Sequence, residues 1–174
     1  MWIVGTNKAD PIFGTNLADR ISGLSGNDVI HAGAGKDEVS GDGGDDTIYG
    51  EDGNDRIVGG GGNDFIYGGA GADIIYGCPG TDRYIYTSIN DSLVTARDTI
   101  RDFDRGEVID LTAIGGLTFI GAAPFSGAAG ELHYVVMGLS KVRVEADVDG
   151  DGAADFAIDV IGVAQPTDAA NFAL

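Results

Sequence analysis

The sequence predicts an all-β chain in which the first half coils into stacked parallel strands and the second half adds a β-rich cap. Residues 5–85 repeat every nine residues without a gap. Glycine makes up 30 of the 174 residues, against an average share of roughly 7%. Residues 87–174 carry short apolar runs separated by turns, with no long helical period. We therefore expect one part over residues 1–86 and a second over residues 87–174.

The repeat is regular at four of its nine positions. Written from Gly5, the blocks are GTNKADPIF, GTNLADRIS, GLSGNDVIH, AGAGKDEVS, GDGGDDTIY, GEDGNDRIV, GGGGNDFIY, GGAGADIIY and GCPGTDRYI. The sixth position is always aspartate: Asp10, Asp19, Asp28, Asp37, Asp46, Asp55, Asp64, Asp73 and Asp82. The eighth is always large and apolar: Ile12, Ile21, Ile30, Val39, Ile48, Ile57, Ile66, Ile75 and Tyr84. The first is glycine except at Ala32, and the fourth is glycine from the third block onward.

Each block combines a tight turn with a short strand. The glycines permit positive φ and a close approach of backbone carbonyls. The three residues after each aspartate form a strand whose central side chain points inward and whose neighbours point outward, because strand side chains alternate. Two blocks then make one coil of 18 residues. Aspartates of successive coils lie near one another, and like charges at that range repel unless a cation separates them.

This pattern resembles G-G-x-G-x-D-x-U-x, the RTX (hemolysin-type) calcium-binding repeat. The resemblance implies a right-handed, calcium-binding parallel β-roll (a β-helix) that is folded only with Ca²⁺. In that family each ion lies between a loop and the loop one coil later. The nine loops allow at most seven such pairs, and we expect about five to seven ions. The pairs that use Asp10 and Asp19 are the weakest, because their loops lack the fourth glycine.

The resemblance also implies backbone ligands. Besides both aspartates, the family uses the carbonyls of the second and fourth residues of one loop and of the first and third residues of the other. Here these carbonyls belong to Gly23, Leu24, Ser25, Gly26, Gly33, Ala34, Gly35, Gly41, Asp42, Gly43, Gly44, Gly50, Glu51, Asp52, Gly53, Gly59, Gly60, Gly61, Gly62, Gly68, Gly69, Ala70, Gly71, Gly77 and Pro79.

The net charge limits the function classes. With 28 acidic and 10 basic residues the chain carries −18, which argues against binding to nucleic acid or to anionic membranes. Seven Ca²⁺ would reduce this charge to about −4, so folding and metal binding should be one equilibrium. The single cysteine, Cys78, excludes an internal disulfide and fits a tolerated small residue in a turn. No apolar run is long enough to insert in a membrane.

The outward faces of the roll differ. One carries a stripe of rings, Phe13, His31, Tyr49 and Tyr67, whereas the other is mostly polar. A large exposed apolar face needs a partner. The expected partner is the C-terminal half or a second copy of the chain, and the alternative is a glycan whose sugars stack on the rings.

Residues 87–174 resemble the C-terminal domain of serralysin-type metalloproteases. The resemblance rests on the segments DTIRDFD with VIDL (98–104 and 108–111), FSG with GEL (125–127 and 130–132), DVDGDGAADF (147–156) and the tail DAANFAL (168–174). It implies a domain that packs on the roll and ends in an uncleaved signal for type I secretion. The chain start lacks the pattern of a signal peptide, so we expect an extracellular protein exported by that apparatus. Asn171 departs from the family, in which an acidic residue usually precedes the last apolar ones.

Two further acidic groups could hold a cation. One is Asp98, Asp102, Asp104 and Asp110, where the roll meets the second half. The other is Asp147, Asp149 and Asp151, which fit the start of an EF-hand loop. The twelfth position of that loop is Ile158 instead of glutamate, so Asp155 or Asp159 would have to substitute. A tight glycine turn between two strands is the favoured interpretation there.

The sequence favours a non-catalytic module. It contains neither H-E-x-x-H nor G-x-S-x-G, and no G-K-[ST] follows its glycine-rich loops. The leading hypothesis is a secreted calcium-binding module whose folding is triggered by extracellular Ca²⁺ and supports type I secretion. An extracellular polysaccharide-binding module is the alternative, by analogy with the calcium rolls that accompany alginate epimerases. A third hypothesis is an enzyme with an unrecognised acid–base site in the C-terminal half.

Overall fold

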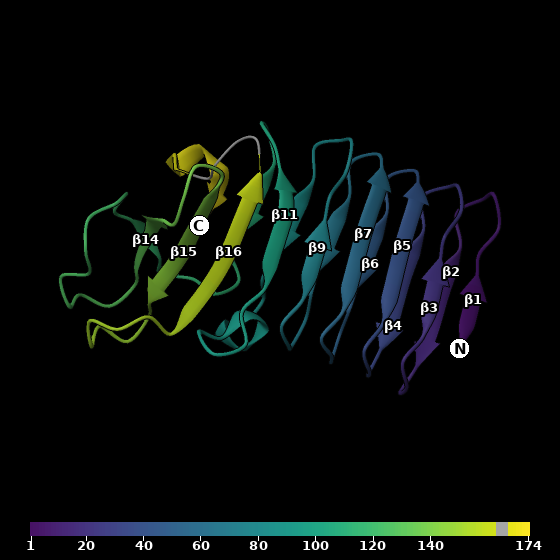
Figure 1. Cartoon of the computed structure of the whole chain (residues 1–174), viewed down its shortest axis with the longest axis horizontal. Helices are drawn as coiled ribbons and strands as arrows, with labels where there is room; N and C mark the ends of the chain where they lie inside the picture. Colours follow the sequence, from purple (N-terminus) through teal and green to yellow (C-terminus); the bar gives the residue numbers. More distant parts are fainter. Residues whose placement is uncertain (163–166) are drawn as a thin grey trace.

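The computed structural model describes residues 1–162 and 167–174. Its strands form two sheets that lie on either side of one elongated core, with the first and last strands at opposite ends (Figure 1). The only helices in the described ranges are two short 3-10 turns, η1 (Ile89–Ser92) and η2 (Ala169–Asn171). Within those ranges no helix has the length and apolar character needed to span a membrane.

The repeats build five strands of the seven-stranded sheet and four strands of the ten-stranded sheet. Odd blocks give β2 (Pro11–Thr15), β4 (Val29–Gly33), β6 (Thr47–Tyr49), β8 (Phe65–Tyr67) and β10 (Arg83–Ile85). Even blocks give β3 (Arg20–Ser22), β5 (Glu38–Gly43), β7 (Arg56–Gly61) and β9 (Ile74–Tyr76). All pair in parallel with a register of 18 residues, as in Ile30↔Ile48. The predicted coil is therefore confirmed.

The inward column of the repeats is the core of the roll. All nine eighth-position side chains are buried, from Ile12 to Tyr84. Burial of an Ile or Val side chain contributes roughly 2 kcal/mol, so this column supplies much of the stabilisation of the roll. Strand β1 (Trp2–Val4) adds one more rung, because it pairs in parallel with β3 and places Ile3 opposite Ile21. We did not predict this strand, although Ile3 precedes Ile12 by one block length.

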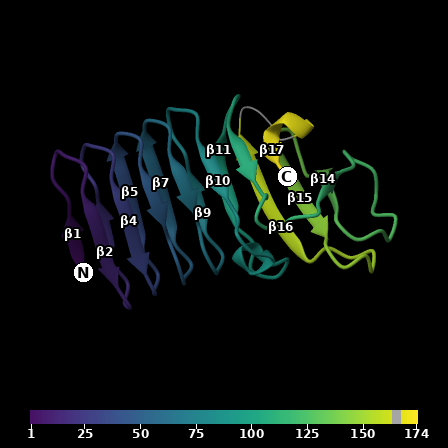
Figure 2. The ribbon, with the colours of Figure 1, turned by 180° about the vertical axis from the view of Figure 1, so that it is seen from behind.

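The second half continues both sheets. In the ten-stranded sheet, β9 is followed by β11 (Thr99–Phe103), β16 (Phe156–Gly162), β15 (Lys141–Asp147), β14 (Glu131–Val136) and β13 (Thr118–Phe119). In the seven-stranded sheet, β10 is followed by β12 (Val108–Asp110) and β17 (Phe172–Ala173). The β-rich structure expected after residue 86 is present. The second half thus extends the stack edge to edge (Figures 1 and 2).

Candidate metal centre

The nine repeat aspartates form two columns, one beside each sheet. Those from Asp19 to Asp82 are buried, with exposed fractions of 3% or less. In seven successive pairs the backbone N–H of one aspartate donates to Oδ1 of the aspartate 18 residues later, at 2.7–2.9 Å. These are the seven loop pairs expected from the sequence, from Asp10/Asp28 to Asp64/Asp82.

The second carboxylate oxygen of most of these residues has no partner. Oδ2 is buried and without a hydrogen bond in Asp28, Asp37, Asp46, Asp55, Asp64, Asp73 and Asp82. A buried carboxylate with an unpaired oxygen is strongly destabilising, and it either takes up a proton or binds a cation. Seven such hard anionic oxygens, aligned with turn carbonyls, are the donors that Ca²⁺ prefers. The residues present therefore fit the expected ion.

Burial shifts the proton affinity of these groups in the same direction. It raises the pKa of Asp46 and Asp55 to about 6, against backbone hydrogen bonds that lower it. The same cause raises the pKa of Asp64 and Asp73 to about 7. A neighbouring ladder carboxylate adds to the increase in each case. Without a cation, these groups are difficult to ionise in the folded state.

Glycine at the first position makes room for the free oxygens. A Cβ on Gly41 would lie 2.2 Å from Oδ2 of Asp46 and 2.5 Å from the carbonyl oxygen of Gly59. No larger residue fits between them without movement. The second position instead requires left-handed backbone, which Leu24 adopts at φ 75° and Cys78 at φ 71°. Cys78 is thus in a turn, as expected.

In the first two loops a threonine occupies the free oxygen of the aspartate with hydrogen bonds. Oδ2 of Asp10 accepts from the backbone N–H and hydroxyl of Thr6, at 2.6 and 2.7 Å. Oδ2 of Asp19 accepts in the same way from Thr15, at 2.7 and 2.8 Å. Five pairs therefore have free oxygens on both aspartates, and the pairs that use Asp10 or Asp19 have one. The missing fourth glycine indicates the same two loops, but the role of the threonines was not predicted from the sequence.

The four acids expected at the junction are separated by the fold. Asp98 is fully buried beneath Asp73, whose N–H donates to its Oδ1. Asp102 accepts from the N–H groups of Gly77 and Cys78. Asp110 pairs with Arg83 at 2.7 Å, and Asp104 is exposed. The expectation of one shared site is therefore wrong, because β11 and β12 belong to different sheets.

The loop after β15 has converging carboxylates. Ligand atoms of Asp147, Asp149 and Asp151 lie within 4.8 Å of one another, which makes them the one such group of metal-ligand side chains in the described residues. Both oxygens of Asp147 accept backbone N–H groups, from Gly150 and Gly152. The loop joins two antiparallel strands, as the favoured turn interpretation predicted. Its binding of a cation stays a prediction.

The two possible EF-hand substitutes lie apart. Oδ2 of Asp155 accepts N–H groups of Val148 and Asp149, within the loop. Asp159 is in β16 and pairs with Arg97, Lys141 and Arg143, while Ile158 is buried in the core. The cluster around Asp159 was not predicted from the sequence. The alternation of charge along β15, with Lys141 and Arg143 two residues apart, was the available signal.

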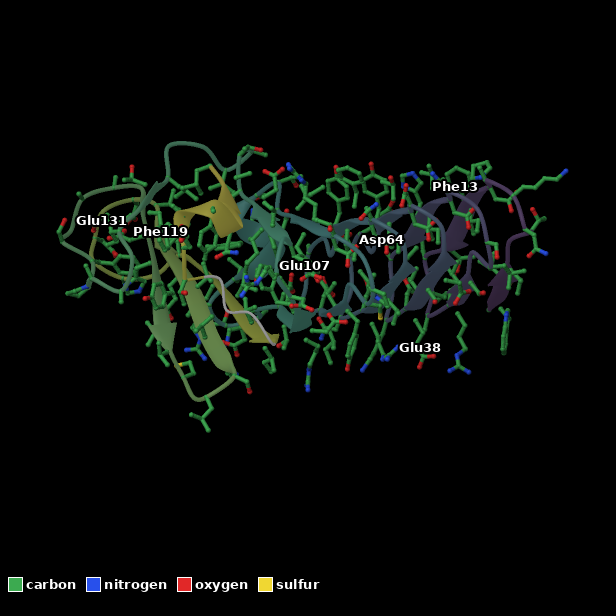
Figure 3. All side chains as sticks on the ribbon, turned by 90° about the horizontal axis from the view of Figure 1, so that it is seen from above. Phe13, Glu38, Asp64, Glu107, Phe119 and Glu131 are labelled. Atoms are coloured by element: carbon green, nitrogen blue, oxygen red, sulfur yellow. The ribbon has the colours of Figure 1, made fainter. Side chains whose placement is uncertain are left out.

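The ring stripe is not covered by the second half. Its four rings stack on one another at centroid separations of 5.3, 4.6 and 4.5 Å, and Phe13 remains 65% exposed. Figure 3 shows Phe13 and Glu38 on opposite outer faces, with Phe119 and Glu131 beyond the end of the roll. Of the two partners expected for the stripe, residues 87–174 do not cover it, because these residues extend the sheets instead of packing on their faces. A second copy of the chain as the partner stays a prediction.

Comparison with known proteins identifies the repeats. The family model "RTX calcium-binding nonapeptide repeat (4 copies)" matches residues 13–48 and 49–84. Among curated proteins no match was found.

Two solved structures resemble this chain along nearly its whole length. One is the solution structure of the AlgE6R2 subunit of the mannuronan C5-epimerase from Azotobacter vinelandii, with 24% identity over 99% of this chain and 91% of that one, and a TM-score of 0.48. The other is the crystal structure of extracellular lipase LipA from Serratia marcescens, with 14% identity over 99% of this chain and 39% of that one, also with a TM-score of 0.48.

Proposed function

Because residues 13–84 belong to the family of RTX calcium-binding nonapeptide repeats, which bind Ca²⁺, we propose that this chain is a secreted, non-catalytic module whose folding is triggered by extracellular calcium. The observation that carries the proposal is the set of seven buried aspartate oxygens without a partner. A cation that binds them stabilises the fold and has no preformed site in the unfolded chain.

The stoichiometry follows from the free oxygens. Five pairs have a free oxygen on each aspartate: Asp28/Asp46, Asp37/Asp55, Asp46/Asp64, Asp55/Asp73 and Asp64/Asp82. These are the five strong sites of the repeats. The pairs Asp10/Asp28 and Asp19/Asp37 offer one free oxygen each and are weak sites.

Coupled folding suits export in an unfolded state. At the low calcium concentration of a cytosol, the charge of −18 and the unpaired aspartates keep the chain unfolded. Millimolar calcium outside shifts the equilibrium towards the fold by mass action. The tail that resembles a type I secretion signal forms β17, where Phe172 pairs with Ile109 and is 8% exposed. We therefore expect the tail to be accessible to the export apparatus before calcium binds and docked afterwards.

The test is a calcium titration of the full chain, followed by far-UV circular dichroism and calorimetry, with magnesium as the control. The expected result is a cooperative gain of β-structure with about five or more ions per chain. Magnesium should fail because it requires a smaller, octahedral shell. A chain that is already folded in chelator, with a spectrum unchanged by calcium, would refute the proposal.

A polysaccharide-binding function is the second candidate, favoured by the exposed ring stripe. The interplanar angles of 6°, 7° and 21° show that the rings cover one another's faces. Sugars bind aromatic faces, and the two inner rings, His31 and Tyr49, have a ring on each side, so the ends of the stripe and the ring edges remain for them. Calorimetric titration of the calcium-bound chain with neutral and acidic polysaccharides, beside Phe13→Ala and Tyr49→Ala variants, separates the two functions. Binding that both variants weaken at least tenfold would favour this candidate.

A further inference from the structure

The repeat register does not end with the ninth block. Residue Ile100 pairs with Ile75, and Ile109 pairs with Tyr84, so each is displaced by 25 residues instead of 18. Both side chains are fully buried in the column of inward residues. The extra seven residues are accommodated in the segment that contains η1. Strands β11 and β12 therefore form a further coil of the roll, outside the residues that match the repeat family.

In this coil Asp98 occupies the place of a repeat aspartate. The N–H of Asp73 donates to Oδ1 of Asp98 at 2.8 Å, the same bond that links successive aspartates of the repeats. Asp98 is 0% exposed, and its Oδ2 has no hydrogen-bond partner, as is true of Oδ2 of Asp73. A Cβ on Gly68 would lie 2.7 Å from the free oxygen of Asp73 and 3.2 Å from that of Asp98. Both free oxygens thus border the space that this glycine leaves open.

Glu107 occupies the corresponding place beside the other sheet, 25 residues after Asp82. It is 1% exposed, and Figure 3 shows it at the end of the roll, where the second half begins. Its Oε2 accepts from the hydroxyl of Tyr84 at 3.1 Å and from the N–H of Asp104 at 2.9 Å. Its Oε1 has no partner, and neither has Oδ2 of Asp82.

The hydroxyl of Tyr84 connects the two acids of this second pair. A Cβ on Gly77 would lie 2.3 Å from Oδ2 of Asp82 and 2.5 Å from the hydroxyl oxygen of Tyr84. That hydroxyl donates to Oε2 of Glu107, so it joins the space that Gly77 leaves open beside Asp82 to the second carboxylate. An unpaired buried carboxylate costs several kcal/mol, and two side by side cost more. Neither Asp98 nor Glu107 would be retained in this state by packing alone.

We infer that the pairs Asp73/Asp98 and Asp82/Glu107 each hold one further calcium ion, so that the metal array extends one coil beyond the nonapeptides. This inference rests on the proposed function. The array of calcium sites would then extend from Asp28 to Glu107. The loops of Asp10 and Asp19, whose Oδ2 atoms are bonded by Thr6 and Thr15, lie at its N-terminal end. Calcium also becomes a ligand that joins the repeats to the second half, because each new site takes one carboxylate from each part.

The first test counts ions by native mass spectrometry of the full chain in calcium. Asp98→Asn and Glu107→Gln should each carry one ion fewer than the wild type. Asp104→Asn is the matched control, because Asp104 is exposed and three residues from Glu107, and it should keep the wild-type count. Wild-type counts in both Asp98→Asn and Glu107→Gln would overturn the inference while leaving the proposed function intact. A wild type that binds no calcium would overturn both.

The second test uses the wild-type chain, so it does not depend on whether the variants fold. Crystals of the wild-type chain grown in calcium should show anomalous difference peaks between Asp73 and Asp98 and between Asp82 and Glu107. Peaks confined to the pairs from Asp10/Asp28 to Asp64/Asp82 would overturn the inference, since the repeats alone would then hold all the calcium.

Discussion

The roll and the outer strands of the second half bury carboxylates to similar depth but compensate them in opposite ways. Asp64 is 1% exposed and Asp159 is 6% exposed. Asp64 has a free oxygen and no cationic partner among the contacts of the described residues, and burial raises its pKa to about 7. Asp159 accepts from Arg143 and Lys141 at 2.8 Å; burial would raise its pKa, but these bonds lower it to about 2.

From this difference we expect the folding of the roll to depend on calcium, and the packing of the outer strands β14–β16 not to depend on it. In the second half the compensating charge is covalently part of the chain, so it is always available. In the roll we propose that it comes from solution, and the stability of the fold should then rise with the calcium concentration. Four predictions test the contrast, in order of decreasing effect.

The largest effect should be an inversion of the pH dependence by calcium. In chelator, the folded roll binds more protons than the unfolded chain, because burial raises the pKa of the ladder aspartates from about 4 to about 6 or 7. Its stability should be greatest below pH 4 and fall as the pH rises through 7.

With calcium bound, the sign reverses because protons compete with the ion for the same oxygens. Far-UV circular dichroism at pH 5 and pH 8 should therefore show more β-structure at pH 5 in chelator and a more stable fold at pH 8 in calcium. The same pH trend in both buffers would mean that the aspartates are compensated within the chain.

The second prediction concerns a single ladder residue. Asp55 contributes to the pairs Asp37/Asp55 and Asp55/Asp73, so Asp55→Asn should remove up to two ions and about 4 kcal/mol of stability in saturating calcium. Asp19→Asn is the matched control, since Oδ2 of Asp19 is bonded by Thr15. It should cost less than about 1.5 kcal/mol. Thermal unfolding and ion counting measure both, and equal losses would contradict the distinction between loops in which threonine bonds Oδ2 of the aspartate and loops in which this oxygen is free.

The roll could be predicted from the sequence because each coil repeats the same two constraints. Aspartate and a large apolar residue recur every nine positions, and both are dictated by local geometry that the next coil copies. The period is lost where seven extra residues precede Asp98, although the coil itself continues. A loop of that length extends away from the core, and β9 still pairs with β11. The insertion therefore removes the nine-residue period from the sequence without ending the coil in the structure.

The remaining differences arise from tertiary contacts. Strand β17 has two residues, which is too short to show any periodicity, and it exists because Phe172 completes the inner column after Ile109. Glu107 was missed because it replaces the expected aspartate with a side chain one methylene longer. The sequence did not show that residues 87–174 leave the ring stripe uncovered, because covering a face and extending an edge both bury apolar surface, and composition alone does not distinguish them.

The third prediction tests the compensated side of the contrast. Asp159→Asn leaves Arg97, Lys141 and Arg143 without their common anion, and the lowered pKa corresponds to about 2 kcal/mol of stability. This contribution is present above pH 4 and is lost as the pH falls towards 2. Thermal unfolding in saturating calcium should show the loss with no change in the ion count. Asp104→Asn, at an exposed position outside this cluster, should change the stability by less than about 0.5 kcal/mol.

The smallest effect should come from the backbone of the roll. Leu24 is at the second position of its block, where glycine is the family residue, and it adopts φ 75° with 40% of its surface exposed. An L-residue with a β-carbon is disfavoured in this region by about 1 kcal/mol, and glycine is not. Leu24→Gly should therefore raise the thermal midpoint in calcium by a few degrees, since little apolar contact is lost. The same substitution at Leu139, which is fully exposed outside the roll, should give no increase. If Leu24→Gly lowered the midpoint, the packing of this side chain would contribute more to stability than the backbone strain costs. The glycines at this position would then be explained by the space they leave for the metal ion and not by their φ.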